Sequence, residues 1–218
     1  MKSKKRTPKP FLNRYTTLPV LLDMLAHKKI LLLNPTTWED RNDSHYLERY
    51  KADKKLKTLL ALCFSIKRET FHHWKIFASG SAGVCVEFDK EQLLNPITAQ
   101  PGFRLSKVDY LYIKEVKKSR PAVENWPFIK RKPFKDEGEF RIIYESKTAE
   151  EPTKEVSIQV NCIRKVTLSP WMPTSVASTV KTIISQIDGC EKLKVKPSSL
   201  LETNEWKAAI KSESSTNK

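Results

Sequence analysis

Glycine is scarce in this chain, since only five of its 218 residues are glycine. Loops that bind phosphate groups through backbone amides are usually rich in glycine, and neither Gly-x-x-x-x-Gly-Lys-Ser/Thr nor Gly-x-Gly-x-x-Gly occurs in the sequence. The sequence therefore gives no support to a kinase, a P-loop enzyme or a standard dinucleotide-binding fold.

Long apolar runs and closely spaced cysteines are also missing. Apolar runs such as Ile30–Leu33 are strand-sized and far below the roughly 20 residues that cross a bilayer. The basic N-terminus has no apolar stretch behind it of the kind found in signal peptides, so we expect a cytoplasmic protein. The four cysteines include no Cys-x-x-Cys pair and have no ligand spacing with the four histidines, which predicts buried free thiols and no zinc site.

Positive charge is the strongest compositional feature that is present. The chain has 40 Lys and Arg residues against 25 Asp and Glu, which gives a formal charge of +15. Charge of this sign favours encounter with nucleic acid, nucleotides or other polyanions, although a solubilising surface explains it equally well. The length suits one domain with a substantial core. We expect a basic disordered arm over residues 1–10, one α+β domain over 11–210 and a disordered tail over 211–218.

Strand and helix patterns are mixed along the chain rather than alternating regularly. This mixture predicts an α+β fold, with mixed, largely antiparallel sheets and short flanking helices. Strands are predicted over 11–15, 30–33, 59–65, 83–88, within 104–112, and over 137–145, 156–160, 162–168 and 193–195; helices are predicted over 18–27, from near 44 to 51, and over 70–77, 90–94, 115–118 and 175–187.

The most informative polar motif is the segment Asp136–Arg141. Alternation along a strand puts Glu137, Glu139 and Arg141 on one face and turns Phe140 into the core. Neighbouring carboxylates repel each other, which raises the pKa of one of them unless a cation such as Arg141 is near. Such a group can hold a sugar hydroxyl or stabilise a developing cation. A solvated strand face with a local ion pair has the same pattern.

Two earlier strands end in polar residues. In Asn13-Arg14-Tyr15, the arginine is able to clamp a phosphate or brace a carboxylate, although an exposed arginine beside a core tyrosine is the simpler interpretation. Ser65 ends a buried strand and could project into a cleft. No Gly-x-Ser-x-Gly elbow surrounds it, so the sequence gives little support to a hydrolase triad.

Carboxylates and histidines form two further motifs. Asp40 and Asp43 are able either to bind a metal ion or to cap the helix that follows them. The adjacent His72 and His73 point in different directions on a helix or a strand, so they are not suited to binding one ion together. One of them could act as a base, but ordinary structural or surface roles are the preferred interpretation.

The segment Trp126–Lys132 alternates aromatic residues with a basic run. Such a segment is able to stack on bases and hold phosphates. The opposite interpretation, with aromatic residues in the core and cations in solvent, fits equally well.

Taken in order, these motifs resemble the bacterial and phage family called domain of unknown function 2971. The resemblance implies an association with phages, mobile elements and defence regions. It rests on residues 12–15, a helix, 31–35, 38–40 with 42–43, 63–65, Trp74, 83–88 and 134–141.

The chain also resembles, more loosely, ADP-ribosyltransferases that have an arginine on an early strand, a serine-containing strand and a Glu-x-Glu segment, in that order. The resemblance implies that Arg14 holds the diphosphate of NAD and that Ser65 braces the site. Glu139 would stabilise an oxocarbenium-like transition state and orient the acceptor. The usual Ser-Thr-Ser run is missing, because Ser65 follows Cys63-Phe64. The predicted catalytic residues are Glu139, Glu137 and Arg141, and the predicted cofactor-binding residues are Arg14, Tyr15, Ser65 and Trp74, with NAD as cofactor and no metal.

Three functions remain open from the sequence. The first is an enzyme acting on a nucleotide such as NAD. The second is a non-catalytic module that binds nucleic acid through Lys130, Arg131 and Lys132, or a regulatory module. The third is a metal-dependent nuclease that uses Asp40, Asp43 and the paired glutamates.

Overall fold

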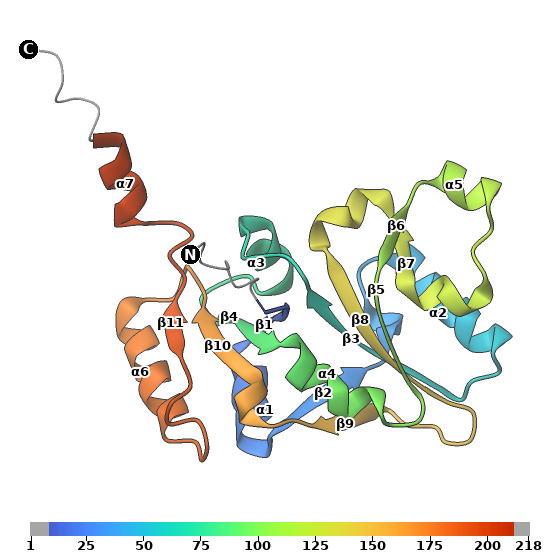
Figure 1. The fold of residues 1–218 in the computed structure, drawn as a ribbon, viewed down its shortest axis with the longest axis horizontal. Helices are drawn as coiled ribbons and strands as arrows, with labels where there is room; N and C mark the ends of the chain where they lie inside the picture. Colours follow the sequence, from blue (N-terminus) through green and yellow to red (C-terminus); the bar gives the residue numbers. More distant parts are fainter. Residues whose placement is uncertain (1–8, 212–218) are drawn as a thin grey trace, which may run out of the picture.

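The computed structural model describes residues 9–211, and the predictions for residues 1–8 and 212–218 lie outside them. Figure 1 shows the arrangement of the elements along the chain. The strands are β1 (Phe11–Thr17), β2 (Lys29–Leu33), β3 (Thr58–Ser65), β4 (Gly83–Asp89), β5 (Phe103–Lys107), β6 (Asp109–Leu111), β7 (Ile129–Arg131), β8 (Glu139–Ser146), β9 (Thr153–Ser157), β10 (Ile163–Leu168) and β11 (Val195–Pro197). The helices are α1 (Leu18–His27), α2 (Arg41–Asp53), α3 (Phe71–Phe77), α4 (Lys90–Thr98), α5 (Ile113–Lys118), α6 (Thr174–Ser185) and α7 (Asn204–Lys211), with 3-10 turns η1 (Pro35–Thr37), η2 (Val123–Phe128), η3 (Lys132–Glu137) and η4 (Val160–Cys162).

The predicted α+β class, with mostly antiparallel strands, is confirmed. Nine strands form one sheet in the order β11-β10-β4-β1-β3-β2-β9, with β8 also on β3 and β5 on β8. Every pairing in it is antiparallel except β10 with β11. Strand β3 is the branch point, because it pairs with β8 along its length but meets β1 only where Asn13 faces Ser65.

The main core lies on one face of this sheet. Helices α1, α4 and α6 cover it, each with a stripe of buried apolar residues. Phe140 and Ile142 point into this core, as the alternation of β8 predicts. Leu21 and Leu25 of α1 are completely buried, and burial of one such side chain stabilises the fold by about 1.5–3 kcal/mol. Most of the apolar side chains of the sheet are therefore packed on this face.

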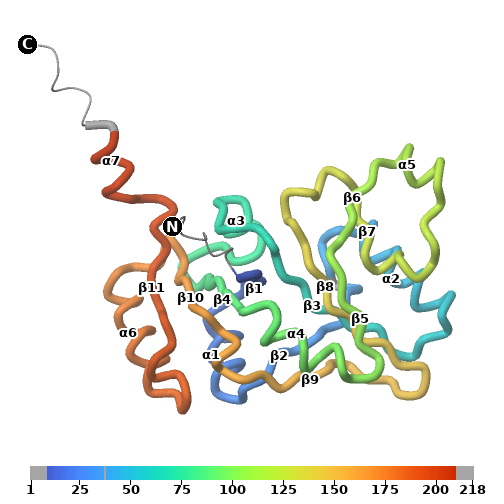
Figure 2. Tube along the Cα trace, in the orientation of Figure 1, coloured from blue at the N-terminus to red at the C-terminus, as the bar shows by residue number. Residues whose placement is uncertain are grey.

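A small lobe stands on the opposite side, and we call residues 109–137 the distal lobe. It contains the parallel pair β6–β7 together with α5, η2 and η3. The tube in Figure 2 shows it beside α2, beyond the edge of the large sheet. A second apolar cluster holds it there, in which Phe128 packs with Leu47 and Tyr50 of α2 and with Ile143 of β8.

Several element boundaries differ from the prediction for local reasons. Helix α2 begins at Arg41 instead of near Ser44, because the Asp40 carboxylate accepts hydrogen bonds from the backbone amides of Asn42 (3.0 Å) and Asp43 (3.4 Å). Strand β8 begins at Glu139 instead of Glu137.

Gly138 causes this later start, because its φ of +52° ends η3 in the left-handed region before the strand begins. Other corrections are smaller. Thr17 precedes α1 but makes no capping hydrogen bond through its side chain, and α4 continues to Thr98 through Pro96. The strands predicted over 156–160 and 193–195 occupy Thr153–Ser157 and Val195–Pro197, and α7 was not predicted.

The four cysteines are free thiols, as predicted. Cys85, Cys162 and Cys190 are buried and Cys63 is partly buried. Burial raises the pKa of the Cys85 thiol to about 12, so this thiol is protonated at neutral pH. Within residues 9–211, no helix has both the length and the apolar character required to span a membrane.

Candidate functional site

A row of polar residues crosses the sheet on the face opposite the main core. Directly paired residues of neighbouring strands share a face, and the pairs connect from one strand to the next across β10, β4, β1, β3 and β8. At about 4.8 Å between strands, four steps span roughly 19 Å. The members of this polar row are Lys165, Glu87, Asn13, Ser65 and Glu139.

Arg141 organises the end of the row at β8. Its Nε donates to Glu139 Oε1 at 2.7 Å, as the shared strand face predicts. Its two terminal nitrogens donate to both oxygens of Asp43 at 3.0 and 2.7 Å, and one also donates to the Pro127 carbonyl at 2.8 Å. The side chain is 0% exposed, and the Trp38 ring lies 4.8 Å from its guanidinium carbon. Because the guanidinium meets two carboxylates in this geometry, it is held as a fixed positive charge.

Lys130 of the distal lobe adds a second cation to this group. Its Nζ donates to Glu137 Oε2 at 2.7 Å and lies 3.6 Å from Glu139 Oε2 and 3.7 Å from Asp43 Oδ2. We call Asp43, Lys130, Glu137, Glu139 and Arg141 the charge cluster. Its three carboxylates and two cations leave one excess negative charge when all five groups are ionised.

The two glutamates of the cluster differ in acidity. Burial raises the pKa of Glu137 above its ordinary value, and the nearby Lys130 offsets this only in part. Burial also acts to raise the pKa of Glu139, but the Arg141 guanidinium outweighs it and lowers the pKa to about 2. Glu139 is therefore the permanently ionised carboxylate, and Glu137 is the one that takes up a proton more readily.

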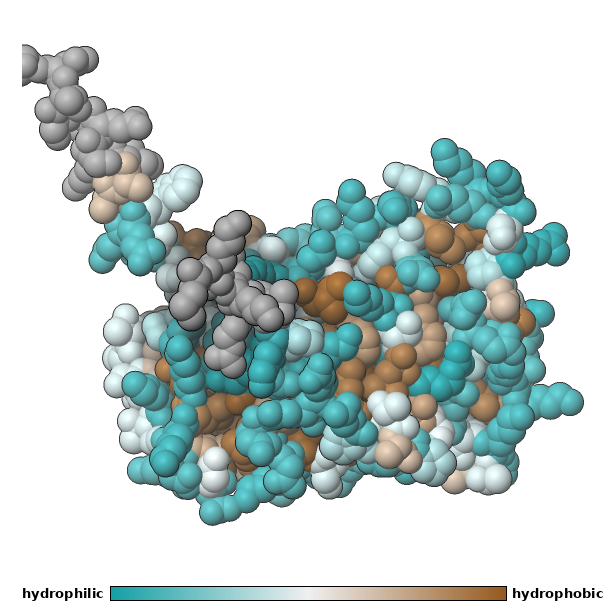
Figure 3. Space-filling view, viewed as in Figure 1, coloured by the Kyte–Doolittle hydropathy of each residue, from teal (hydrophilic) through white to brown (hydrophobic). Residues whose placement is uncertain are grey.

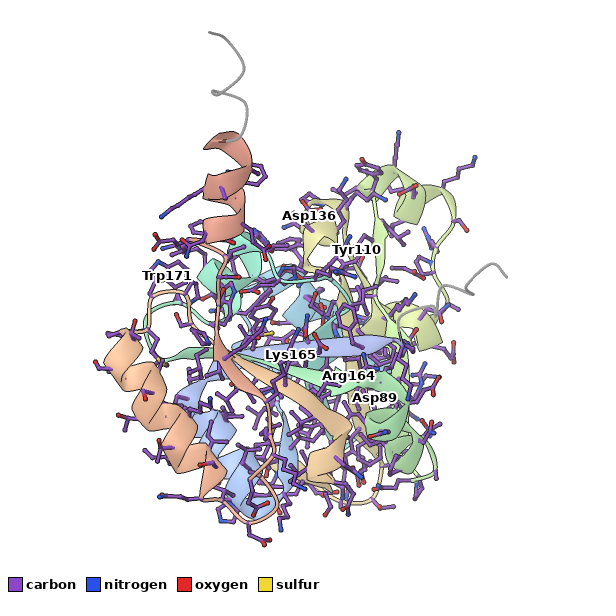
Figure 4. The ribbon with its side chains drawn as sticks, turned by 60° about the vertical axis from the view of Figure 1, so that its left-hand side comes forward. Asp89, Tyr110, Asp136, Arg164, Lys165 and Trp171 are labelled. Atoms are coloured by element: carbon purple, nitrogen blue, oxygen red, sulfur yellow. The ribbon has the colours of Figure 1, made fainter. Side chains whose placement is uncertain are left out.

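The distal lobe encloses Glu139 in this conformation. The residue is 6% exposed, and its backbone amide donates to the hydroxyl of Tyr110 on β6 at 2.8 Å. Figure 4 shows Tyr110 on the lobe. One carboxylate oxygen, Oε2, makes no hydrogen bond to nitrogen shorter than its 3.6 Å approach to Lys130. Lys130 of the distal lobe is therefore the cation next to this oxygen.

Ser65 and His73 fix the backbone just before Glu139. Ser65 Oγ lies 2.9 Å from His73 Nε2 and donates to the Glu137 carbonyl at 2.7 Å. His73 Nε2 is 2.9 Å from the same carbonyl, which only accepts, so this nitrogen carries the proton. Its Nδ1, 2.6 Å from Thr70 Oγ1, is then the acceptor.

This tautomer excludes a nucleophile–base pair in the conformation shown, because a protonated Nε2 cannot take a proton from Ser65. Burial lowers the pKa of His73, which keeps the ring neutral. His73 is therefore a buried structural residue and His72 is exposed, so each has one of the two ordinary roles preferred from the sequence.

The predicted cofactor-binding residues fall into two groups. The Tyr15 ring stacks on His73 with centroids 5.2 Å apart and meets Trp74 edge-on at 5.3 Å, so both aromatic residues lie behind Ser65. Arg14 alternates with Asn13 along β1 and points to the other face, where its guanidinium donates to the Cys63 carbonyl at 3.4 Å. Burial lowers the pKa of Arg14 to about 10. The structure thus brings Ser65, Glu137, Glu139 and Arg141 together, with Tyr15 and Trp74 nearby, and keeps Arg14 across the strand.

A cavity of about 400 Å³ lies over the opposite end of the polar row, and we call it the basic cavity. Figure 4 shows Arg164 and Lys165 in this region, on β10. Lys165 pairs with Glu87 at 2.8 Å, and Arg164 pairs with Asp89 at 2.8 Å. The lining contains four cations and two carboxylates among Lys9, Phe11, Asn13, Arg68, Glu69, Cys85, Glu87, Arg164, Lys165 and Thr167.

Asn13 connects the basic cavity with the rest of the row. Its Nδ2 donates to the Lys67 carbonyl at 2.9 Å, whereas its Oδ1 is buried without a hydrogen-bond partner among the described residues. An unpaired buried acceptor costs about 1–3 kcal/mol, which a donor on a bound ligand can recover. Asn13 is therefore the member of the row that most directly indicates a ligand.

Three members of the polar row, Lys165, Glu87 and Asn13, were not predicted as site residues from the sequence, and neither was the role of Lys130. The visible signal was a polar residue within each buried strand, such as Glu87 in Val84-Cys85-Val86-Glu87-Phe88. The register that lines these residues up was not available, because it depends on how distant strands pair.

Other predicted motifs have structural roles. Phe128 is buried, so the base-stacking interpretation of residues 126–132 is wrong for this ring; Trp126 is partly buried against the second apolar cluster, and Lys130 belongs to the charge cluster. Asp40 is the helix cap described above, and Asp43 is paired with Arg141. In the part of the chain that the structure describes, no three His, Cys, Asp or Glu residues are grouped so as to hold a metal ion.

No family model matches the chain, so the resemblance to domain of unknown function 2971 stays a prediction. No curated protein matches it either. Among solved structures, the chain is similar to DarT of Thermus sp. 2.9 in complex with NAD+, with 10% identity, coverage of 90% of this chain and 99% of that chain, and a TM-score of 0.49. The complex of that DarT with ADP-ribosylated ssDNA gives 10% identity, 92% and 99% coverage and a TM-score of 0.49.

Proposed function

We propose that the chain is an enzyme that binds a nucleotide such as NAD along the polar row and transfers its ADP-ribosyl group. One observation carries the proposal: the row joins a cavity rich in cations to an ionised, desolvated carboxylate on the same sheet face. Phosphates are stabilised by cations, and a sugar carbon that develops positive charge is stabilised by a carboxylate. The two ends of the row suit the two ends of such a ligand.

In the proposed reaction, the bond between the ribose carbon and the nicotinamide nitrogen breaks. Its electron pair leaves with nicotinamide, which becomes neutral, and the ribose carbon develops positive charge that Glu139 stabilises. A nucleophilic acceptor then forms a bond to that carbon and releases its proton. Glu139 acts as an anion throughout, which agrees with its lowered pKa of about 2.

The surrounding residues position these groups. Arg141 keeps Glu139 ionised and fixes its Oε1, which leaves Oε2 for the substrate. Ser65 and His73 hold the Glu137 carbonyl and with it the start of β8, and Tyr15 and Trp74 support the His73 ring.

The phosphate-binding role moves from Arg14 to the cations of the basic cavity. Arg14 lies across β1 from the row, whereas Arg68, Arg164 and Lys165 line the cavity over it. Of these, Arg68 is exposed and makes no ion pair with any residue in the range 9–211, so it is available to a phosphate.

Calorimetric titration with NAD and measurement of nicotinamide release test the two halves of the proposal separately. Lys165→Gln is expected to weaken NAD binding about tenfold, since a hydrogen bond to a charged group contributes about 1.5–3 kcal/mol. Lys154→Gln is the matched control, because Lys154 has a similar exposure and pairs with Glu151 at 2.9 Å far from the row. Equal binding by the wild type and Lys165→Gln would refute the assignment of the cavity.

Glu139→Gln is expected to bind NAD and release no nicotinamide. Its thermal unfolding is measured in parallel, so that loss of activity through unfolding is recognised. A folded Glu139→Gln variant with undiminished nicotinamide release would overturn the role of this carboxylate.

A further inference from the structure

The distal lobe carries a concentration of positive charge that the site chemistry does not use. The lobe contains eight Lys and Arg residues and five Asp and Glu, a formal excess of 8 − 5 = +3, and the stretch 112–135 within it holds all eight cations and only two Glu. Both glutamates are occupied within the protein: Glu115 accepts a hydrogen bond from the backbone amide of Tyr112 at 2.6 Å, and Glu124 pairs with Lys54, directly after α2. The lobe as a whole therefore keeps a net positive charge, even with its exposed Asp109 and Asp136 included.

Only Lys130 among these eight cations forms an ion pair within residues 9–211. Elsewhere on the sheet, cations such as Lys154, Arg164 and Lys165 each have an acidic partner. The seven unpaired cations of the lobe, six of them exposed and Lys132 partly buried, are Lys114, Lys117, Lys118, Arg120, Arg131, Lys132 and Lys135. Like charges three and four residues apart, as in α5, destabilise a helix by a few tenths of a kcal/mol, and a bound polyanion removes this cost.

Exposed apolar groups lie among these cations. The Tyr112 ring is 51% exposed, and the ammonium groups of Lys114 and Lys132 lie 5.7 and 5.6 Å from its centre. The adjacent Ile113 is 64% exposed, and the guanidinium of Arg131 lies 5.4 Å from the centre of the half-buried Phe134 ring. Figure 3 shows hydrophilic side chains gathered over α5 on this face of the molecule. A solvent-exposed ring such as that of Tyr112, with cations beside it, provides a stacking surface and phosphate contacts together.

We infer that the distal lobe is a docking surface for single-stranded nucleic acid. A single strand offers both unpaired bases for Tyr112 and phosphates for the lysines, whereas a duplex keeps its bases stacked inside, and an acidic polypeptide has no base to stack. The inference does not rest on the proposed transferase activity, since docking needs no chemistry. The lobe also supplies Tyr110, Lys130 and Glu137 to the site, so a docked strand lies beside it.

Fluorescence anisotropy with labelled oligothymidylate tests the inference on the full chain. Lys114→Gln/Lys117→Gln/Lys118→Gln is expected to weaken binding at least tenfold and to reduce the slope of log affinity against log salt by about 2, at roughly 0.7 for each phosphate that a lysine no longer neutralises. The matched control removes the same charge from exposed lysines at the far end of the molecule, in Lys181→Gln/Lys192→Gln/Lys194→Gln. It is expected to retain nearly full affinity.

Tyr112→Leu separates stacking from charge. It is expected to weaken oligothymidylate binding at least fivefold, with an unchanged salt slope, because stacking on one base contributes about 1–3 kcal/mol. Equal losses in the two triple variants would show that the chain binds by net charge alone and would overturn the inference. Tighter binding of a duplex or of polyglutamate than of oligothymidylate would overturn it as well. Failure of NAD binding alongside intact oligonucleotide binding would reject the proposed function and leave the docking surface standing.

Discussion

Replacement of Arg141 by methionine tests whether the charge cluster holds the sheet, α2 and the distal lobe together. The change keeps a long side chain but removes the cation that meets both Asp43 and Glu139. Three buried carboxylates would then share Lys130 as their only cation. Breaking a buried ion pair from one side costs about 3–5 kcal/mol, because it leaves uncompensated charge in a desolvated place. In a chain of this size, that corresponds to a fall in melting temperature of about 6–20 °C.

Urea unfolding followed by tryptophan fluorescence measures this cost, provided that the transition is two-state. Arg49→Met is the control, since Arg49 is 65% exposed and its pair with Asp53 is expected to contribute less than about 1 kcal/mol. The double variant Arg141→Met/Asp43→Leu removes one carboxylate together with the cation. Its loss of unfolding free energy is therefore expected to be smaller, by about 0.5–3 kcal/mol, than the sum of the losses in the two single variants. A single variant within about 1 kcal/mol of the wild type, or strictly additive effects, would refute the reasoning.

Three other outcomes can be measured in the same way. The pKa of Glu139 in the folded protein, about 2, lies below its ordinary 4.5, so its ionised form contributes about 3 kcal/mol to the free energy of unfolding. This contribution is present above pH 4.5 and is lost as the pH falls toward 2. Unfolding measured across this pH range should show the dependence in the wild type and lack it in Glu139→Gln. Gly138→Ala should cost at least 1 kcal/mol more than Gly80→Ala in urea unfolding, since both have positive φ but only at Gly138 does an added Cβ come within 2.5 Å of a lysine side chain. His73→Phe should lower the melting temperature by leaving buried hydrogen-bonding groups unpaired, at about 1–3 kcal/mol, whereas His72→Phe at the surface should change it little.

Much of the fold could be predicted from the local periodicity of apolar residues in the sequence. The apolar stripe of α1 and its flanking residues predicted Leu18–His27 without error, and alternation in β8 correctly put Glu139 and Arg141 on one face with Phe140 in the core. These predictions succeeded because the period of a helix or a strand is a property of the segment itself. The same reasoning placed Glu137 in the strand, and it failed where the left-handed conformation of Gly138 separates η3 from β8.

Long-range partners explain why the composition of the site was only partly predicted. Asp43 and Arg141 are 98 residues apart and share no motif, yet Arg141 donates to both carboxylate oxygens of Asp43. Similarly, Asn13 is recognised as a site residue only from the pairing of β1 with β3, which places Asn13 between Ser65 and the basic cavity. Alternation within one strand predicts its two faces, but it does not identify the distant strand that pairs with it.

The charge cluster links the two inferences about function. Arg141 and Asp43 hold Glu139 from within the sheet and α2, whereas Lys130 and Glu137 approach it from the distal lobe. Because Arg141 is the main group that lowers the pKa of Glu139 and binds Oε1, a shift of the lobe would move Lys130 away from Oε2 and leave the carboxylate paired with Arg141. A strand bound to Lys114, Lys117 and Lys118 acts on the same lobe that covers this oxygen. Binding of nucleic acid and access to Glu139 should therefore be coupled, and by linkage NAD and oligonucleotide should change each other's affinity by the same factor.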